Sequence, residues 1–218
     1  MAPDPSVPDL AALRREYGDR GLDVPDLAPD PISMFRRWFD DTVAAGLHEP
    51  NAMVVATVSP AGRPSSRTVL LKGVDERGFV FYTNYESRKG AELLAHPLAA
   101  MCFHWQPLER QVRIEGRTAP VSAEEADAYF ASRARGSQIG AWASRQSQPM
   151  EHASALEERV REVEARFAGG DVPRPPHWSG FRLVPARIEF WHNMPSRLHE
   201  RHVYERDGDG WRTTILYP

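Results

Sequence analysis

The pattern of apolar and polar positions predicts one helix near the start of the chain, followed by a series of short strands. Asp30 and Pro31 suit the N-cap and the first position of a helix. Apolar side chains then recur at helical spacing from Ile32 to Val43, and Gly46 is a typical stop signal. We therefore predict a helix that begins at Pro31 and ends near Gly46.

Short apolar runs bounded by turn residues predict the strands, most of which follow one another through hairpin turns. The pattern favours a hairpin between residues 67–72 and 79–83, across a turn at 75–78. Another hairpin turn is expected at 207–210, which reads Asp-Gly-Asp-Gly. The expected strands cover residues 53–58, 67–72, 79–83, 99–105, 111–120, 181–191, 201–205 and 211–216.

Helical patterns are inserted between these strands. Ser87 begins a short helix that ends before Pro97, and Ser122 opens a capping box with Glu125. The expected helices cover residues 87–95, 122–133, 137–144 and 150–167, and a Gly/Pro loop covers 169–180.

The order of these elements indicates the fold class. Hairpin connections favour a mainly β fold, an antiparallel barrel with helices outside it, over a doubly wound parallel sheet. The sequence lacks the glycine-rich signatures of Rossmann, P-loop and nucleophile-elbow proteins. Residues 1–29 are rich in Pro and Asp, so we expect a flexible N-terminal arm and then a single domain over residues 30–218.

Composition narrows the class of protein further. The 218 residues carry a formal net charge of −3, which argues against a general nucleic-acid binder. The single cysteine, Cys102, excludes an internal disulfide. No apolar stretch approaches the roughly 20 residues that span a bilayer, and no signal peptide is evident. We therefore expect a soluble cytoplasmic protein that binds neither nucleic acid nor membranes.

A local basic grouping stands out in this mildly acidic chain. Arg67 and Lys72 flank an apolar run, and Arg88 and Lys89 follow Ser87 at the start of a predicted helix. Cations there oppose the helix dipole unless an anion offsets them, which indicates a phosphate site. Alternation along a regular strand would place Arg67 and Lys72 on opposite faces, facing two different anions. Taken singly, each could instead be a solvated surface cation.

Two other groups could bind a ligand. Gln111 could present its amide to the ring atoms of a heterocycle, or lie on a polar outer strand face. Tyr129 and Arg133 are four residues apart and share a helix face, so with Ser137 they could hold a second phosphate. The alternative for this pair is a core tyrosine beside a surface arginine.

The histidines near the C-terminus allow two interpretations. Arg197, His199 and Arg201 point the same way if they lie on one strand, and a histidine between two arginines is disfavoured as a cation. A metal site built from His192, His199 and His202 would lack a supporting Cys or an H-E-x-x-H motif. We therefore expect a neutral imidazole and no metal.

The chain also resembles one known family in several long motifs, which occur in the same order and spacing. They are RTVLLK, FYTNYESRKG, LERQVRIEG, YFASRARGSQIGAWASRQS, VPRPPHWSGFRLVP, IEFW and RLHER. The family is pyridoxine/pyridoxamine 5′-phosphate oxidase, and the resemblance runs from about Leu13 to the C-terminus. It implies a split β-barrel with FMN at the interface of a homodimer. It also implies oxidation of pyridoxamine or pyridoxine 5′-phosphate to pyridoxal 5′-phosphate, by hydride transfer from C4′ to flavin N5, with dioxygen reoxidising the flavin to give H2O2.

The same resemblance implies roles for individual residues. Arg197 and His199 are the implied catalytic pair, positioning the substrate and orienting it or relaying a proton. The implied FMN contacts are Arg67, Thr68, Val69, Leu70, Leu71, Lys72, Tyr82, Thr83, Arg88, Lys89, Gln111, Gln146, Ser147, Trp191 and Arg201. The implied substrate contacts are Lys72, Tyr129, Arg133, Ser137, Arg197, Leu198 and His199, together with Arg14 and Tyr17 of the arm.

Two alternatives remain open at this point. A related split-barrel flavin oxidase of the phenazine-biosynthesis type would keep the FMN motifs and change the substrate-phosphate set. A non-catalytic flavin- or vitamer-binding protein is the other alternative. Its support is that His192, Asn193 and Met194 stand where the family commonly has Gln-Gly. The C-terminus also departs from the family's Arg-Leu-x-Pro, with Ile215 in place of the arginine.

Overall fold

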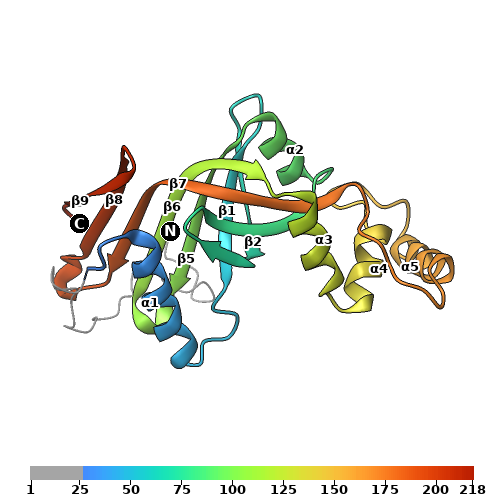
Figure 1. Cartoon of the computed structure of the whole chain (residues 1–218), viewed down its shortest axis with the longest axis horizontal. Helices are drawn as coiled ribbons and strands as arrows, with labels where there is room; N and C mark the ends of the chain where they lie inside the picture. The colour runs from blue at the N-terminus through green and yellow to red at the C-terminus, as the bar shows by residue number, and fades with distance from the viewer. Residues whose placement is uncertain (1–26) are drawn as a thin grey trace, which may run out of the picture.

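A computed structural model describes residues 27–218, within which nine strands form one antiparallel sheet. Seven strands follow the order β2-β1-β5-β6-β7-β4-β3, and β8 pairs with β7 and β9 (Figure 1). The strands are β1 (Ala52–Val58), β2 (Pro64–Leu70), β3 (Gly73–Asp75), β4 (Gly78–Asn84), β5 (Leu98–Trp105), β6 (Arg110–Pro120), β7 (Trp178–His192), β8 (Glu200–Asp207) and β9 (Gly210–Ile215).

The long strand β7 connects the two ends of the sheet because it changes partner along its length. Its first half pairs with β4 and its second half with β8, while β6 pairs with residues 181–192. The β6–β7 register shifts between Glu115 and Gly116. A Cβ atom on Gly116 would lie 2.1 Å from the carbonyl oxygen of Val184, so the shift requires glycine. The predicted fold class, a mainly antiparallel split barrel with peripheral helices, is confirmed.

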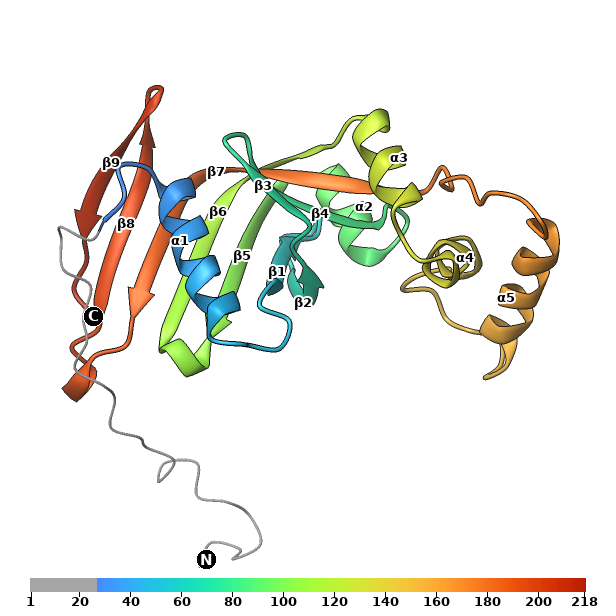
Figure 2. The ribbon, with the colours of Figure 1, turned by 60° about the horizontal axis from the view of Figure 1, so that its bottom comes forward.

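Helix α1 (Pro31–Ala44) packs against the sheet and supplies much of the core (Figure 2). Asp30 accepts hydrogen bonds of 2.9 Å from the N–H groups of Ile32 and Ser33, which confirms the predicted N-cap. Phe35 is fully buried and meets Phe79 edge-on, with 4.9 Å between the ring centroids. Burial of such aromatic rings stabilises the contact between helix and sheet.

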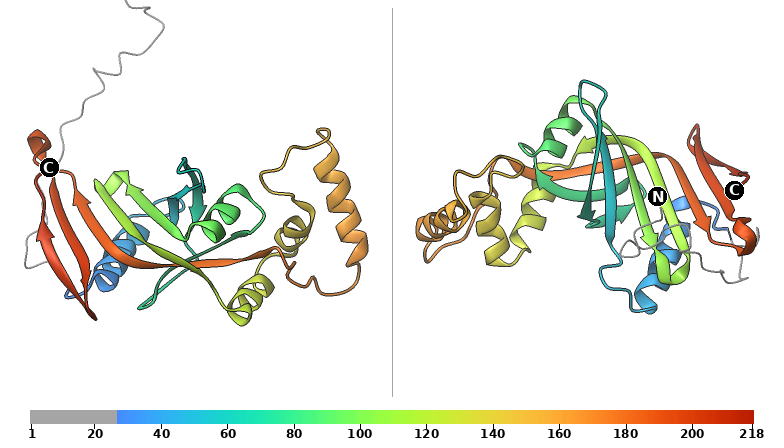
Figure 3. Two further views of the ribbon diagram at one scale, coloured as in Figure 1. Left: turned by 90° about the horizontal axis from the view of Figure 1, so that it is seen from above. Right: turned by 180° about the vertical axis from the view of Figure 1, so that it is seen from behind.

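The other α-helices are α2 (Arg88–Ala95), α3 (Ala123–Ala131), α4 (Arg135–Ala143) and α5 (Ala155–Arg166). Helices α3, α4 and α5 gather at the end of the molecule far from β8 and β9 (Figure 3). Phe130, Ile139 and Trp178 form a second, smaller core there. Helix α4 begins two residues before the predicted start, and α5 is shorter than the predicted helix over 150–167.

The hairpin turn predicted at 75–78 is confirmed, but the predicted pairing of residues 67–72 with 79–83 is wrong. Strand β2 pairs with β1 along its whole length, whereas β4 pairs with the short β3. The chain changes partner between two neighbours: Leu71 donates its N–H to the carbonyl of Asn51, and Lys72 donates to that of Val80, both at 2.8 Å. An apolar run predicts a strand but not its partner, since pairing depends on contacts outside the run.

The start of the chain is described only in part. Residues 1–26, which make up most of the predicted arm, lie outside the described range. Ala28 is buried, and its carbonyl accepts a hydrogen bond of 2.7 Å from the Tyr204 hydroxyl. Within residues 27–218, no helix combines the length and apolar character needed to cross a membrane.

Candidate functional site

A cavity of about 810 Å³ lies where β2, β4 and α2 face the segment from α3 to the loop after α4. A volume of this size suits a cofactor or another organic ligand. Fourteen of the predicted site residues line it: Arg67, Thr68, Val69, Leu70, Lys72, Tyr82, Thr83, Arg88, Lys89, Tyr129, Arg133, Ser137, Gln146 and Ser147. The structure therefore brings the two predicted anion-binding groups into one cavity.

Lys89 is the most deeply buried cation of this cavity, with 8% of its surface exposed. Its Nζ donates to Thr83 Oγ1 and Gln146 Oε1, both at 3.0 Å, and to Ser87 Oγ at 3.4 Å. All three acceptors are neutral. Burial, together with the nearby charge of Arg67, lowers the pKa of Lys89 to about 8. A bound anion would offset this unneutralised charge.

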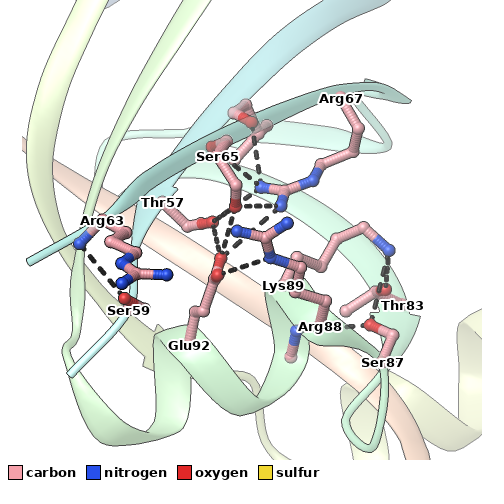
Figure 4. A network of polar contacts seen from close by, with 12 residues as sticks. Thr57, Ser59, Arg63, Ser65, Arg67, Thr83, Ser87, Arg88, Lys89 and Glu92 are labelled. Carbon is pink, nitrogen blue, oxygen red and sulfur yellow. Dashed lines mark hydrogen bonds and ion pairs between the residues drawn. The ribbon is translucent and has the colours of Figure 1, made fainter. Parts of the chain in front are cut away.

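Arg67 and Arg88 differ from Lys89 because the protein already supplies them with a carboxylate. Glu92 Oε2 lies 3.5 Å from Arg67 Nη2, and Glu92 Oε1 accepts a 2.9 Å hydrogen bond from Arg88 Nε (Figure 4). Burial alone would raise the pKa of Glu92, but hydrogen bonds from Thr57, Ser65 and Arg88 outweigh it and lower the pKa to about 2. With Lys89, this group holds three cations and one anion.

The predicted separation of Arg67 and Lys72 onto opposite faces is wrong. Lys72 lies beyond the end of β2, so strand alternation does not apply to it. Both side chains line the same cavity. They can still bind different anions there, because Arg67 lies on β2 and Lys72 lies in the segment between β2 and β3.

Three aromatic rings stack along another part of the cavity wall. The ring centroids of Tyr82 and Tyr129 lie 3.9 Å apart, and Tyr82 stacks on Trp178 at 5.4 Å. The guanidinium of Arg133 lies over Trp178, 4.6 Å from the ring centroid. One of its nitrogens, Nη1, is buried without a hydrogen-bond partner among the described residues, and burial lowers the pKa of Arg133. A group in this state favours an anionic ligand.

The loop after α4 completes the cavity. Gln146 accepts hydrogen bonds from Thr83 and Lys89, so its carbonyl oxygen faces the protein and its amide N–H₂ remains to donate. Ser147 has a φ of 71°, an uncommon conformation for a non-glycine residue. Such local strain is frequent at binding sites.

Other predicted flavin contacts lie outside this cavity. Gln111 pairs with Trp191 across β6 and β7, and its Oε1 lies 3.5 Å from Cys102 Sγ. Arg201 on β8 pairs with Trp191 on β7. Its Nε and Nη2 donate to the two carboxylate oxygens of buried Glu189, at 2.9 and 3.1 Å. Leu71 belongs to the hydrophobic core. Gln111, Trp191 and Arg201 thus form a second group on β6, β7 and β8.

The predicted catalytic pair lies directly before β8, but not on one strand. Arg197 has a φ of 62° in a short 3-10 turn, Pro195–Arg197, and β8 begins only at Glu200. The alternation expected for Arg197, His199 and Arg201 is therefore wrong. His199 packs on Trp191, with 4.7 Å between ring centroids, and its Nδ1 accepts the Met194 N–H.

The electrostatic surroundings of His199 agree with the predicted neutral imidazole, because burial and the charge of Arg197 both lower its pKa. Leu198 is exposed beside it. No three acidic, histidine or cysteine side chains within residues 27–218 are arranged to hold a metal ion. Arg14 and Tyr17 lie outside the described residues.

Sequence reasoning missed two residues that shape the cavity. Glu92 lies on an amphipathic helix, where an acidic residue usually belongs to a solvated face. Its spacing of four residues after Arg88 was the available signal, since such pairs share a helix face. Trp178 fell within a predicted Gly/Pro loop, although it is the first residue of β7.

Comparisons with known proteins give concordant matches over nearly the whole chain. A family model described as pyridoxamine 5′-phosphate oxidase matches residues 39–167. A second, described as the pyridoxine 5′-phosphate oxidase C-terminal dimerisation region, matches residues 178–218. A pyridoxine/pyridoxamine 5′-phosphate oxidase of Rubrobacter xylanophilus is 58% identical, covering 99% of this chain and 100% of the relative. One from Myxococcus xanthus is 60% identical, covering 99% and 97%.

Solved structures share the fold. PhzG from Burkholderia lata 383, in complex with tetrahydrophenazine-1-carboxylic acid, has a TM-score of 0.84 at 36% identity, covering 89% of this chain and 95% of that one. An FMN-binding protein related to pyridoxamine 5′-phosphate oxidase, from Nostoc punctiforme PCC 73102, has a TM-score of 0.69. It is 19% identical, covering 88% and 99% of the two chains, and shows the fold alone.

Proposed function

The chain belongs to the pyridoxine/pyridoxamine 5′-phosphate oxidase family, and we propose that it is an FMN-dependent oxidase that forms pyridoxal 5′-phosphate. Its substrates would be pyridoxamine and pyridoxine 5′-phosphate, with dioxygen as the electron acceptor. The observation that carries this proposal is that one cavity holds two cations, Lys89 and Arg133, without a carboxylate partner among residues 27–218. A cofactor and a substrate that each carry a phosphate would satisfy both.

The phosphate of FMN would lie against Arg67, Arg88 and Lys89. The donor set fits this group, because Lys89 has only neutral acceptors and α2 presents its N-terminus nearby. The amide of Gln146 and the hydroxyl of Ser147 would bind the ribityl chain. The remaining contacts would come from residues 68–72 and from Tyr82 and Thr83.

The phosphate of the vitamer would lie against Lys72, Tyr129, Arg133 and Ser137. Arg133 supplies the supporting observation, because its buried Nη1 lacks a partner while its guanidinium plane is held on Trp178. A planar guanidinium fixed in this way can donate two parallel hydrogen bonds to a phosphate.

FMN held by these residues would supply the redox chemistry, hydride acceptance from C4′ of the substrate and electron transfer to dioxygen to give peroxide. The chain's own residues would orient the substrate for that step. Arg197 would hold the substrate and stabilise negative charge that develops on it. The neutral ring of His199 would carry its proton on Nε2, since Nδ1 accepts the Met194 N–H, and would orient the substrate or relay that proton.

We propose further that the active enzyme is a homodimer whose site contains residues of both copies. The match to a dimerisation region covers β7, β8 and β9. Gln111, Trp191 and Arg201, with the catalytic pair, lie outside the cavity of their own chain. A symmetric dimer would bring this group to the cavity of the partner.

A second candidate function is oxidation of a phenazine precursor, favoured by the similarity to PhzG. Retention of Lys72, Tyr129, Arg133 and Ser137 argues for the phosphorylated vitamer instead. The test is turnover by the purified, FMN-loaded protein, followed as pyridoxal 5′-phosphate and peroxide. Turnover of either vitamer supports the proposal; turnover of tetrahydrophenazine-1-carboxylic acid alone would favour the second candidate. FMN binding without turnover of any of these substrates would indicate a binding protein.

A further inference from the structure

Glu92 is a buried carboxylate beside the cavity that sequence reasoning assigned no role. It lies on α2 with 5% of its surface exposed. Four groups reach it: the hydroxyls of Thr57 and Ser65, the Nε of Arg88, and the Nη2 of Arg67 (Figure 4). A carboxylate with this many donors is ionised and held in one orientation.

The two hydroxyls connect Glu92 to Arg67. Thr57 Oγ1 and Ser65 Oγ each donate their single proton to Glu92 Oε2, the latter at 2.7 Å. Their lone pairs then accept from Arg67, whose Nη1 lies 2.7 Å from Thr57 and whose Nη2 lies 2.6 Å from Ser65. An ionised carboxylate only accepts hydrogen bonds, so it fixes the direction of both hydroxyls.

Glu92 also fixes one edge of the Arg88 guanidinium. The Nε of Arg88 is occupied by the carboxylate, while its Nη groups have no partner among the described residues. The Arg88 side chain is 60% exposed, so without Glu92 it would sample many rotamers. Arg88 lines the cavity, so the contact at Nε limits the directions that its two Nη groups can take there.

Charge alone would make Glu92 unfavourable at this place. A carboxylate beside a phosphate site repels the phosphate, and neutralising it should tighten phosphate binding. A carboxylate that orders two arginines has the opposite effect, because part of the ordering cost is met before the ligand arrives. The two roles therefore predict opposite signs for the same substitution.

We propose that Glu92 is a positioning residue for the cofactor phosphate, orienting Arg88 directly and Arg67 through Thr57 and Ser65. The inference rests on the proposed function, in which these arginines bind the phosphate of FMN. It adds a role for the carboxylate that holds the side chains in contact with the phosphate.

The test compares the affinity of flavin-free, full-length protein for FMN and for riboflavin, which has the same ring and ribityl chain without the phosphate. Glu92→Gln is expected to weaken FMN binding about tenfold or more. Riboflavin binding should change less than about twofold, because the lost interaction concerns the phosphate alone. The matched control is Glu86→Gln, the same change at an exposed carboxylate just before α2. It should leave both affinities within about twofold of wild type.

Tighter or unchanged FMN binding by Glu92→Gln would overturn the positioning role. Equal losses for FMN and riboflavin would also overturn it, since they indicate general damage to the fold. A second pair of variants keeps Glu92 intact: Thr57→Val removes the shared hydroxyl and should weaken FMN binding selectively, and Thr57→Ser should restore it. If wild-type protein binds no FMN, the proposed function itself fails, which is a distinguishable result.

Discussion

At the scale of single residues, the cations of the cavity differ in what the protein already provides for them. Arg67 and Arg88 share the carboxylate of Glu92, whereas Lys89 meets only neutral oxygen atoms. Arg133 is held over an aromatic ring and keeps one nitrogen unpaired. A bound phosphate should therefore stabilise the charged forms of Lys89 and Arg133 more than those of Arg67 and Arg88.

Lys89 should make FMN affinity depend on pH. Its pKa of about 8 without ligand lies below the ordinary 10.5, and a phosphate favours the charged form. Affinity should thus fall by up to about tenfold per pH unit above 8, because binding then takes up a proton. The phosphate itself titrates near 6 and does not contribute there. Flavin fluorescence titrations from about pH 7 to about 9.5 measure the effect.

The control for this dependence is Lys89→Met, which should bind FMN weakly with little slope over the same range. An equal slope in wild type and Lys89→Met would contradict the assignment. The stability of the flavin-free protein should change in the opposite direction. Folding depresses the pKa of Lys89, so its cost is present in full below pH 8 and is relieved as the pH rises toward 10.5.

Arg133 offers a test of the substrate phosphate site. Arg133→Lys keeps the charge but loses the planar fork and the stacking on Trp178, so KM for pyridoxamine 5′-phosphate should rise about tenfold or more. FMN affinity should stay within about twofold, because this group does not contact Lys89 or Glu92. Steady-state kinetics of the loaded enzyme measure KM, with exposed Arg161→Lys as the matched control. An unchanged KM would contradict the assignment of Arg133.

At the level of elements, α2 places Arg88 and Lys89, and its docking depends on one glycine. A Cβ atom on Gly90 would lie 2.5 Å from the carbonyl oxygens of both Asn84 and Tyr85. The first turn of α2 therefore lies directly on the end of β4. The N-cap Ser87 accepts the Gly90 N–H at 3.2 Å and fixes the same turn.

Gly90→Ala should displace α2 and weaken FMN binding by at least about tenfold, with a loss of stability of about 2 kcal/mol or more. Gly136→Ala is the matched control, because a Cβ atom there meets nothing within 4 Å and alanine favours a helix. FMN titration and chemical denaturation measure both variants. Equal behaviour of the two variants would contradict this account of helix docking.

Much of the element order could be predicted because its signals are local. Asp30, Ser87 and Ser122 each cap the helix that the sequence indicates. Strand partners could not be predicted in the same way, and the chain between Leu70 and Gly73 passes from β1 to β4 without a turn signal. Residues of the cavity that matched long motifs were found, whereas Glu92 was missed because its burial depends on packing against β1 and β2.

At the scale of the whole molecule, the predicted site residues fall into two groups at different parts of one sheet. The cavity holds the phosphate-binding candidates, while Arg197 and Arg201 lie in the turn before β8 and on β8 itself. Figure 1 shows β8 and α4 at opposite ends of the molecule. The sequence motifs assigned all of these residues to one site, because a motif does not show which copy of the chain supplies each residue. A homodimer would reconcile the two groups.

Complementation tests this arrangement. Arg133→Ala and Arg197→Ala should each be nearly inactive, but mixed dimers should contain one intact site. With random pairing, half of the dimers are mixed and half of their sites are intact, so about a quarter of wild-type activity should return. Activity of co-expressed variants measures this recovery. No recovery, with mixed dimers present, would show that each site is built within one chain.

The proposal that the cavity holds FMN and a phosphorylated vitamer together requires that the vitamer reduce the flavin. It is tested most directly by the visible spectrum of the FMN-loaded protein when pyridoxamine 5′-phosphate is added without oxygen. The flavin absorption band should bleach, then return on admission of air as pyridoxal 5′-phosphate accumulates. A flavin band that stays unchanged with both pyridoxamine and pyridoxine 5′-phosphate would contradict it.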